Sequence, residues 1–299
     1  MSKPLTGDQN PFRIDTKQRR RAFERAAQTY DSVAVLQSEV GDRLLQRLDL
    51  IKCTPKTVID VGAGTGKAVR ALGKRYRGAR ILALDIALPM LQLTRTRAGW
   101  IRRPAVLCAD AEALPLADAS IELIFSNLTL QWCNDLELAL REFRRVLAPG
   151  GLAVFTTLGP DTLRELRDSW SKVDDYTHVN HFTDMHDIGD ALLRVGFADP
   201  VMDMEMMSLT YPDVMQLMRE LKLIGAQNKT LGRPPGLTGK DRLGRLIKAY
   251  EALRTAQGVI PASYEVVFGH AWALDRKLPS DASPGLKEVP ISLEQLRKR

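Results

Sequence analysis

Short apolar runs alternate with amphipathic stretches along the first half of the chain. Each run is bounded by polar residues or glycine and is rich in valine, isoleucine or leucine, which is typical of buried parallel strands. Such runs occupy 57–61, 81–85, 105–109, 121–126 and 152–158. Between them, apolar residues recur every three or four positions, which predicts helices near 66–77, 89–98 and 135–147. This alternation of strands and helices predicts an α/β fold built on a mostly parallel sheet.

The second half of the chain departs from this alternation. Two more helices are predicted at 163–170 and 186–196, and two more strands at 201–211 and 260–272. Between those strands, a helix is predicted with Pro212 at its first position, and a second helix over 241–254. We therefore expect a helical insertion at 212–258, and such insertions commonly shape substrate pockets.

Two amphipathic helices are predicted before the first strand, over 16–30 and 33–48. Apolar positions such as Ala22 and Ala26 mark one face of the first helix. The arginines fill the rest, which predicts a solvated face or, as a sharper hypothesis, a contact for an acidic partner: Arg19, Arg20, Arg21 and Arg25. The predicted division is a tail and flap helices at 1–52, a ligand-binding core at 53–211, a helical lid at 212–258, a last core strand at 259–274 and a disordered tail at 275–299.

The first predicted strand runs directly into a glycine turn, in the sequence TVIDVGAGTG at 57–66. Gly62, Gly64 and Gly66 allow the backbone to approach a ligand closely. Their spacing is G-x-G-x-G and differs from the G-x-G-x-x-G of dinucleotide sites. The carboxylate of Asp60 would repel a pyrophosphate but suits a cationic ligand such as S-adenosylmethionine (SAM), which carries an ammonium and a sulfonium.

Carboxylates also end the next two predicted strands. Asp85 lies nineteen residues beyond Gly66, where an acid can accept hydrogen bonds from both ribose hydroxyls. Asp110 and Glu112 follow the third strand and are placed to hold the adenine amino group. Any one of these acids can instead cap a strand, but three together are far more specific than a glycine loop alone. Further candidates for the same site are Ala63, Ile86, Met90 and Ala111.

This pattern resembles the class I SAM-dependent methyltransferases. The resemblance continues through FSNL at 125–128 and RVLAPGG at 145–151. It implies a Rossmann-like fold with a seven-stranded, mostly parallel sheet, helices on both faces and a helical lid between strands six and seven. It also adds Asn127 and Leu128 to the cofactor site, with SAM as cofactor and S-adenosylhomocysteine (SAH) as product.

Three later segments resemble one branch of this superfamily, the malonyl-[acyl-carrier protein] O-methyltransferases of biotin biosynthesis. They are LGPDTLREL at 158–166, the stretch 178–228 and YEVVFGHAWA at 264–273, so that the resemblance covers roughly 23–273. It implies an enzyme that converts the free carboxyl of a malonyl thioester to its methyl ester. The implied partner is malonyl-acyl carrier protein or malonyl-CoA, with no membrane involved.

The chemistry of such a reaction limits the residues that it needs. A malonyl carboxylate is ionised at neutral pH and requires no general base, so that positioning and desolvation supply the acceleration. Tight ion pairing would stabilise the ground state more than the transition state. We therefore expect neutral hydrogen-bond donors, and the candidates are Tyr30, Gln37, Trp132, His178 and His181.

Metal ligation is the alternative for the histidines, because carboxylates stand nearby. The spacing of these side chains matches no zinc motif that we know, and the reaction needs no metal, so we expect none. The group considered is His178, His181, Asp184, His186 and Asp187.

Composition and charge narrow the setting. The 299 residues carry a net charge of +7, which favours an acidic partner such as a carrier protein. Nucleic acid is disfavoured because no basic stripe with interleaved aromatic residues is visible. Cys53, Cys108 and Cys133 show no paired spacing and predict reduced thiols in a cytoplasmic protein. The candidate carrier contacts are Arg141, Arg144, Arg145, Arg219, Lys222, Lys229 and Arg233.

Three other functions remain open at this stage. The chain could methylate another small molecule or RNA, could be a SAM-binding complex-assembly factor related to a protein-arginine hydroxylase, or could be a SAM-binding regulator without turnover.

Cys133 is expected to be inert. The alternating methionines of the sixth strand are expected to fill the core: Met202, Met204, Met206 and Met207.

Overall fold

The computed structural model describes residues 10–98, 103–234, 236 and 238–273, so the tail predicted at 275–299 lies outside the described residues. The helices are α1 (Thr16–Ala26), α2 (Tyr30–Val33), α3 (Val35–Arg47), α4 (Lys67–Arg75), α5 (Leu88–Arg97), α6 (Leu136–Val146), α7 (Arg164–Ser171), α8 (Met185–Arg194), α9 (Val214–Leu223) and α10 (Lys240–Glu251), with short 3-10 turns η1 (Leu48–Leu50) and η2 (Leu130–Trp132). The strands are β1 (Thr57–Val61), β2 (Arg80–Asp85), β3 (Ala105–Cys108), β4 (Ile121–Ser126), β5 (Leu147–Leu158), β6 (Phe197–Tyr211) and β7 (Ile260–Ala273).

These strands form one seven-stranded sheet in the order β3-β2-β1-β4-β5-β7-β6. The first five strands are parallel, whereas β7 runs antiparallel to both β5 and β6. The predicted class I methyltransferase fold with a mostly parallel sheet is therefore confirmed. All carboxyl ends of the parallel strands meet at one edge, where ligands bind in such sheets.

Helices cover both faces of the sheet because successive residues of each strand point to opposite sides. Val58 and Phe125 belong to the apolar cluster that contains residues of α3 and α4. Ile59 and Ile124 belong to the cluster that contains residues of α6 and α8. The strands buried on both faces are thus the ones that read as unbroken apolar runs.

Some element boundaries differ from the prediction for local reasons. Strand β5 begins at Leu147, so the Pro-Gly-Gly sequence lies within it as an irregularity opposite Ile121–Leu123, and does not form a separate turn. Helix α9 is capped by Asp213, whose side chain accepts from Gln216 N at 2.9 Å, so Pro212 precedes the cap and does not occupy the first helical position.

The methionines of β6 divide between two environments, because β6 is the edge strand of the sheet. Met202 and Met207 pack against the two apolar clusters, whereas Met204 and Met206 are 42% and 46% exposed. The prediction that all four fill the core was therefore wrong for Met204 and Met206.

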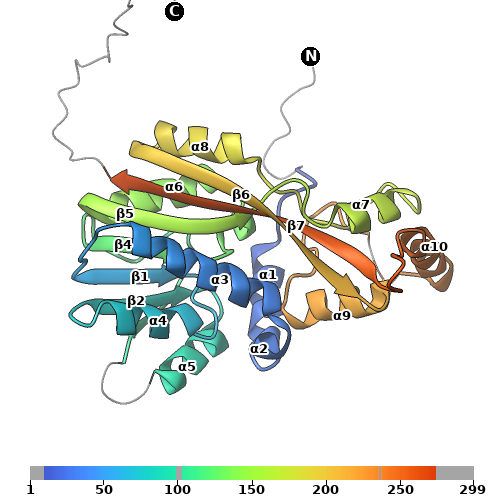
Figure 1. The fold of residues 1–299 in the computed structure, drawn as a ribbon, viewed down its shortest axis with the longest axis horizontal. Helices are drawn as coiled ribbons and strands as arrows, with labels where there is room; N and C mark the ends of the chain where they lie inside the picture. The colour runs from blue at the N-terminus through green and yellow to red at the C-terminus, as the bar shows by residue number, and fades with distance from the viewer. Residues whose placement is uncertain (1–9, 99–102, 235, 237, 274–299) are drawn as a thin grey trace, which may run out of the picture.

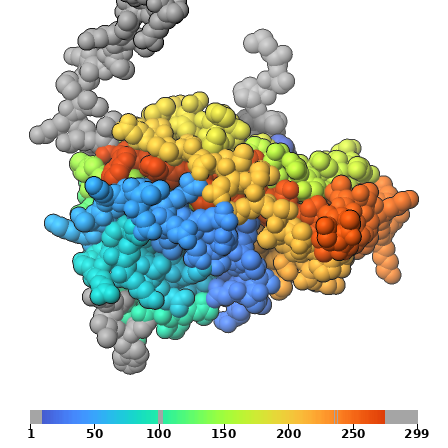
Figure 2. Space-filling model, in the orientation of Figure 1, coloured from blue at the N-terminus to red at the C-terminus, as the bar shows by residue number. Residues whose placement is uncertain are grey.

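Strands β6 and β7 are long and extend past the core strands toward α7, α9 and α10 (Figure 1). Helices α9 and α10 lie between them in the sequence. In the same view, α1 and α2 stand between the core sheet and α9, and Figure 2 shows that these segments form one continuous surface. The boundaries predicted for the lid and the flap remain predictions.

Candidate functional site

A cavity of about 490 Å³ opens at the carboxyl edge of the sheet. Its walls come from the loops after β1, β2, β3 and β4, from the N-terminal helices, and from the segments around α7 and α9. One half is lined by carboxylates and glycine backbone, and the other half is mainly apolar. The apolar half includes Leu158, Leu163, Leu166, Trp170, Val179, Phe182, Met218 and Leu221.

The glycine loop after β1 is held against β2 and leaves room at its tip. The backbone N–H groups of Gly62 and Ala63 both donate to Leu84 O, at 2.8 and 2.9 Å. Gly62 has φ +79°, and an added Cβ there would lie 1.9 Å from Thr129 Oγ1, so both the backbone angle and the space require glycine. An added Cβ on Gly64 would meet nothing within 4 Å, and Gly64 lines the cavity. The open face of the loop therefore lies at Gly64.

Asp85 ends β2 with its carboxylate facing this loop. Oδ2 accepts from Gly64 N at 2.9 Å and Oδ1 accepts from Ala87 N at 2.8 Å. Burial raises the pKa of Asp85, opposed by these backbone N–H groups and by the positive charge of Arg19. Each oxygen accepts one backbone hydrogen bond and has a further lone pair for the hydroxyls of a vicinal diol.

Asp60 lies beneath the loop, only 2% exposed and outside the cavity lining. Its Oδ2 is buried without a hydrogen-bond partner. Burial and the neighbouring charge of Asp85 raise the pKa of Asp60 to about 8. A buried carboxyl with an unsatisfied oxygen beside a second acid is suited to a positive ligand, reached directly or through water.

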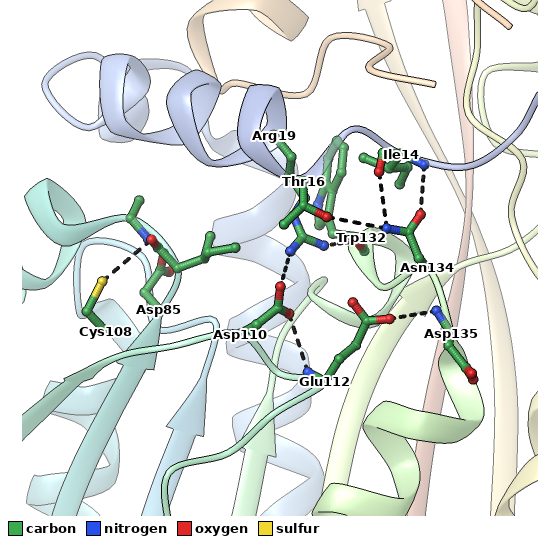
Figure 3. A network of polar contacts seen from close by, with 12 residues as sticks. Ile14, Thr16, Arg19, Asp85, Cys108, Asp110, Glu112, Trp132, Asn134 and Asp135 are labelled. Atoms are coloured by element: carbon green, nitrogen blue, oxygen red, sulfur yellow. Dashed lines mark hydrogen bonds and ion pairs between the residues drawn. The ribbon is translucent and has the colours of Figure 1, made fainter. Parts of the chain in front are cut away.

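Asp110, after β3, is held by an arginine from the N-terminal helix α1 (Figure 3). Arg19 Nη2 donates to Asp110 Oδ2 at 2.6 Å, and Nη1 donates to the carbonyl oxygen of Trp132. Arg19 is 3% exposed, so the prediction that it belongs to a solvated arginine face was wrong. Asp110 keeps 26% of its side chain exposed and lines the cavity.

Most of the residues predicted for the cofactor line the cavity, and four do not. Asp60, Ala63, Gly66 and Glu112 are absent from the lining, and Glu112 accepts from Asp135 N at 2.7 Å. Those that line it are Gly62, Gly64, Asp85, Ile86, Met90, Asp110, Ala111, Asn127 and Leu128.

Four of the five predicted substrate-positioning residues also line the cavity, namely Tyr30, Gln37, Trp132 and His178. His181 does not; its ring packs against Phe12 with centroids 5.4 Å apart. Burial raises the pKa of Tyr30, so its phenol keeps its proton at neutral pH and is able to donate.

His178 is fixed by stacking and by a carboxylate. Its ring lies parallel to Trp170 with centroids 3.6 Å apart, and Nε2 lies 2.8 Å from Asp174 Oδ1. Burial lowers the pKa of His178, which favours the neutral ring. A neutral ring whose Nε2–H donates to Asp174 presents Nδ1 as an acceptor, so a donor role would require the protonated form.

Several lining residues were not predicted from the sequence, and two of them, Arg19 and Asn180, each carry a buried polar atom without a partner. Arg19 was recognisable in principle, since it shares the helical stripe of Ala22 and Ala26, at spacings of three and seven. Asn180 is 6% exposed with Oδ1 buried and unpartnered, and it lies in a loop that has no periodic signal. Such an unsatisfied amide at a cavity wall is suited to a polar ligand group.

The pKa of Asp60 leads to a testable pH dependence. A cation bound beside Asp60 favours its ionised form, so binding below pH 8 releases a proton. We expect the dissociation constant of SAH to fall by about tenfold per pH unit between pH 6 and 7.5 and to level above pH 8. Calorimetric titrations across this range provide the test, with Asp60→Asn as the variant that loses the slope. A wild-type affinity that does not change with pH would contradict the prediction.

The same shift affects stability without ligand. Because the folded-state pKa lies above the ordinary value of 3.8, folding binds a proton, and this contribution is lost as pH rises through about 8. Asp60→Asn should therefore gain thermal stability relative to wild type at pH 8.5 and little at pH 4.

Neither a metal centre nor a membrane span is evident in the part of the chain that the structure describes. Within those residues, no three or more His, Cys, Asp or Glu side chains gather in a way that could hold a metal ion. No helix in the described ranges is both long and apolar enough to cross a bilayer. Burial raises the pKa of Cys133, which keeps its thiol protonated.

Comparisons with known proteins identify the family of this chain. Residues 59–155 match the family described as "Methyltransferase domain". A protein of Halorhodospira halophila is 50% identical over 287 residues, covering 96% of this chain and 97% of its own length. One of Gallionella capsiferriformans is 49% identical over 284 residues, covering 93% and 98%. Both are named malonyl-[acyl-carrier protein] O-methyltransferase.

Solved structures support the fold alone. The YcgJ protein of Bacillus subtilis aligns with a TM-score of 0.55 at 15% identity, covering 78% of this chain and 99% of its own. A SAM-dependent methyltransferase of Thermotoga maritima aligns with a TM-score of 0.51 at 18% identity, covering 85% and 99%.

Proposed function

Because the chain belongs to the malonyl-[acyl-carrier protein] O-methyltransferase family, we propose that it methylates the free carboxyl of malonyl-acyl carrier protein with SAM as methyl donor. It is a SAM-dependent methyltransferase. The observation that carries the proposal is one cavity that joins acid-ended strands to an apolar chamber under α9. The alternatives of another acceptor, an assembly factor or a regulator are not favoured by the relatives.

The residues of the first half-site fit SAM by the chemistry of their donors and acceptors. SAM supplies an electrophilic methyl group on a sulfonium. Asp85 would accept from the ribose hydroxyls, Asp110 from the adenine amino group, and Asp60 would balance the ammonium through space or water. The open backbone at Gly64 would leave room for the ligand, as a side chain there would not.

The second half-site would hold the acceptor. The malonyl carboxylate is ionised at neutral pH, so the chain needs no base and moves no proton. Apolar walls such as Leu163 and Trp170 would strip water from that carboxylate, which makes its oxygen a better nucleophile. The neutral phenol of Tyr30 would orient it without the strong ground-state pairing of an arginine clamp.

Gln37, Trp132 and Asn180 are the other side chains that we propose for orienting the acyl group. Trp132 is itself braced by Phe23, edge to face, with ring centroids 5.2 Å apart. His178, with Nδ1 as acceptor, would suit an amide N–H of the pantetheine arm better than a carboxylate. These roles are assigned to the cavity that the described residues form.

The direct experiment is mass analysis of the acceptor. Purified protein incubated with SAM and malonyl-acyl carrier protein should add the mass of one methylene group to the carrier and produce SAH. Cleavage of the acyl thioester with neutral hydroxylamine should release the added mass together with the malonyl group, because the methyl ester lies on that group. Acetyl-acyl carrier protein, which lacks the free carboxyl and should gain no mass, serves as the negative control. Absence of the addition on the malonyl form would overturn the proposal.

An acidic carrier protein would meet a basic cluster at the mouth of the cavity. Arg233 lines the cavity, and burial, followed by the charges of Arg233, Arg25 and Lys222, lowers the pKa of Lys229. We name these four residues the rim cluster. The arginines of α6 suit this role less well, since Arg145 is bound to Glu142 and Asp118.

Reversing two charges of the rim cluster should weaken carrier recognition. Lys222→Glu with Lys229→Glu is expected to raise the KM for malonyl-acyl carrier protein by about tenfold and to leave that of malonyl-CoA nearly unchanged. Lys52→Glu with Lys74→Glu, two exposed lysines outside the cavity lining, is the matched control. Equal effects on both thioesters would count against carrier docking at this rim.

The pathway, the thioester and the compartment belong to the same proposal. A methyl ester masks the charge of the malonyl group, as an early step toward the pimeloyl moiety of biotin would require. Malonyl-CoA carries the same reactive group and is the alternative acceptor. Unpaired thiols at Cys53, Cys108 and Cys133 support the cytoplasm as the compartment.

A further inference from the structure

The N-terminal segment of the described chain runs between the core and the loop after α9. We name residues 10–16 the strap. On the core side, Ile14 N donates to Asn134 Oδ1 at 2.7 Å, and Asn134 Nδ2 donates to Ile14 O at 3.1 Å (Figure 3). The side-chain amide of Asn134 therefore acts as a short piece of β-ladder for the strap.

On its other side, the strap is paired with the loop at 228–233. Asp15 N donates to Lys229 O at 2.9 Å, Leu231 N to Arg13 O at 2.9 Å, and Gly232 N to Pro11 O at 2.7 Å. An added Cβ on Gly232 would lie 2.9 Å from Pro11 Cβ and 3.0 Å from both Pro11 O and Thr177 Oγ1. The loop is thus packed against the strap too closely for a side chain.

The strap ends in the N-cap of α1, and α1 carries Arg19 into the cofactor half of the cavity. Asp15 accepts from Gln18 N at 3.0 Å, which fixes the first turn of the helix. Arg19 follows within that turn and reaches both Asp110 Oδ2 and Trp132 O. The segment that pairs with the loop at 228–233 therefore continues directly into the helix that carries this guanidinium.

The guanidinium of Arg19 is able to orient two acceptors at once. A planar guanidinium binds a carboxylate and a carbonyl at once in fixed directions, which an ammonium cannot do. Its Nε is buried without a partner, a cost that native structures rarely accept away from functional sites. With Oδ2 held by Arg19 and Oδ1 accepting from Glu112 N at 3.3 Å, the Asp110 carboxylate has one orientation, and it remains partly exposed to the cavity.

We propose that Arg19 is a positioning residue for adenine recognition, acting through Asp110, and that the strap makes this recognition depend on the loop at 228–233. The inference rests on the proposed SAM site and goes beyond it, because it assigns a cofactor role to the N-terminal segment. Arg19 holds Asp110 so that its free lone pairs accept from the adenine amino group. Displacement of the loop moves the strap, α1 and this carboxylate together.

The test compares SAH with S-inosylhomocysteine, in which a carbonyl replaces the adenine amino group. Wild type should bind SAH at least 30-fold more tightly than S-inosylhomocysteine, on the order expected when a partly buried acceptor loses its donor. Arg19→Met should weaken SAH binding by about tenfold and reduce the preference for SAH over S-inosylhomocysteine to a few-fold. Arg19→Lys should give values between those of wild type and Arg19→Met. Arg20→Met, on an exposed neighbour paired with Glu24, should change neither value.

A purely structural role for Arg19 predicts a different result, in which the binding of both ligands weakens equally and the preference for SAH is unchanged. That outcome would overturn the proposal, as would tighter SAH binding by Arg19→Met, which would mean that the arginine blocks the adenine site. If Arg19→Met does not fold, Arg19→Lys decides by the same preference.

The coupling through the strap is tested with glycine variants of the loop. Gly232→Ala should weaken SAH three- to tenfold without acyl substrate present, because the added Cβ displaces the strap. Gly239→Ala is the matched control, since an added Cβ there meets nothing within 4 Å. SAH affinity within twofold of wild type for Gly232→Ala would overturn the coupling. These readouts need no methyl transfer, so failure to methylate malonyl-acyl carrier protein would leave them standing.

Discussion

Asp85→Ala should weaken SAH binding by about 10²–10³-fold and abolish methylation while the protein stays folded. Both oxygens of Asp85 face the cavity edge, where each accepts one backbone N–H and could accept one ribose hydroxyl. Hydrogen bonds to a charged group contribute about 1.5–3 kcal/mol each, and two account for a loss of this size. Burial raises the pKa of Asp85, so removing the carboxylate also removes a desolvation cost, which limits the loss of stability.

Calorimetry of SAH binding and thermal unfolding of the free protein check this result together. Asp203→Ala is the matched control, because Asp203 is an exposed acid on β6, at the opposite edge of the sheet from β2 and β3. Rescue of a biotin auxotroph gives a cellular readout, in which the control should grow and Asp85→Ala should not. Growth of both variants would show that the activity does not depend on this carboxylate.

Gly62→Ala should destabilise the protein by about 3 kcal/mol or more. Its φ of +79° costs an alanine about 1–2 kcal/mol. In addition, the Cβ would lie 1.9 Å from Thr129 Oγ1 and 2.8 Å from Thr129 Cβ, so one of the two segments must move. Thermal or denaturant unfolding measures the loss directly.

Two companion variants separate the steric cost from the backbone cost. In a Thr129→Gly background the clash is gone, so Gly62→Ala should cost only about 1–2 kcal/mol. Gly64→Ala has φ +52° but open space around the added Cβ, and should cost a similar amount while weakening SAH. Equal destabilisation by Gly62→Ala in both backgrounds would show that contact with Thr129 does not matter.

The apolar pattern predicted the strands closely because buried strands leave an unambiguous record in composition. The run at 57–61 is β1 with the same bounds, and the acid at 85 closes β2. The parallel arrangement then brings Asp85 and Asp110 to one edge, whatever the details of packing. The resemblance to the malonyl-[acyl-carrier protein] O-methyltransferases rested on segments from residue 158 onward. Relatives that are about half identical over nearly the whole chain carry that name.

Features that depend on long-range contacts could not be predicted from local sequence patterns. Arg19 was assigned to a solvated face because a run of arginines is usually solvated, yet Arg19 is buried against a carboxylate 91 residues away in the sequence. Met204 and Met206 were assigned to the core because alternation does not reveal that β6 is an edge strand. Asn180 gave no signal, because a loop residue acquires its surroundings only from the segments packed around it.

Local patterns in the chain were enough to predict the order of strands and helices, the acids and glycines at the ends of the strands, and the class of ligand that those groups suit. Each of these follows from residues close together in the chain, through backbone preference and the periodicity of burial. The burial of Arg19, the raised pKa of Asp60 and the hydrogen bonds between the strap and the loop at 228–233 arise only in the folded chain. Burial and the pairing of distant charges depend on three-dimensional proximity, and spacing along the chain does not encode it.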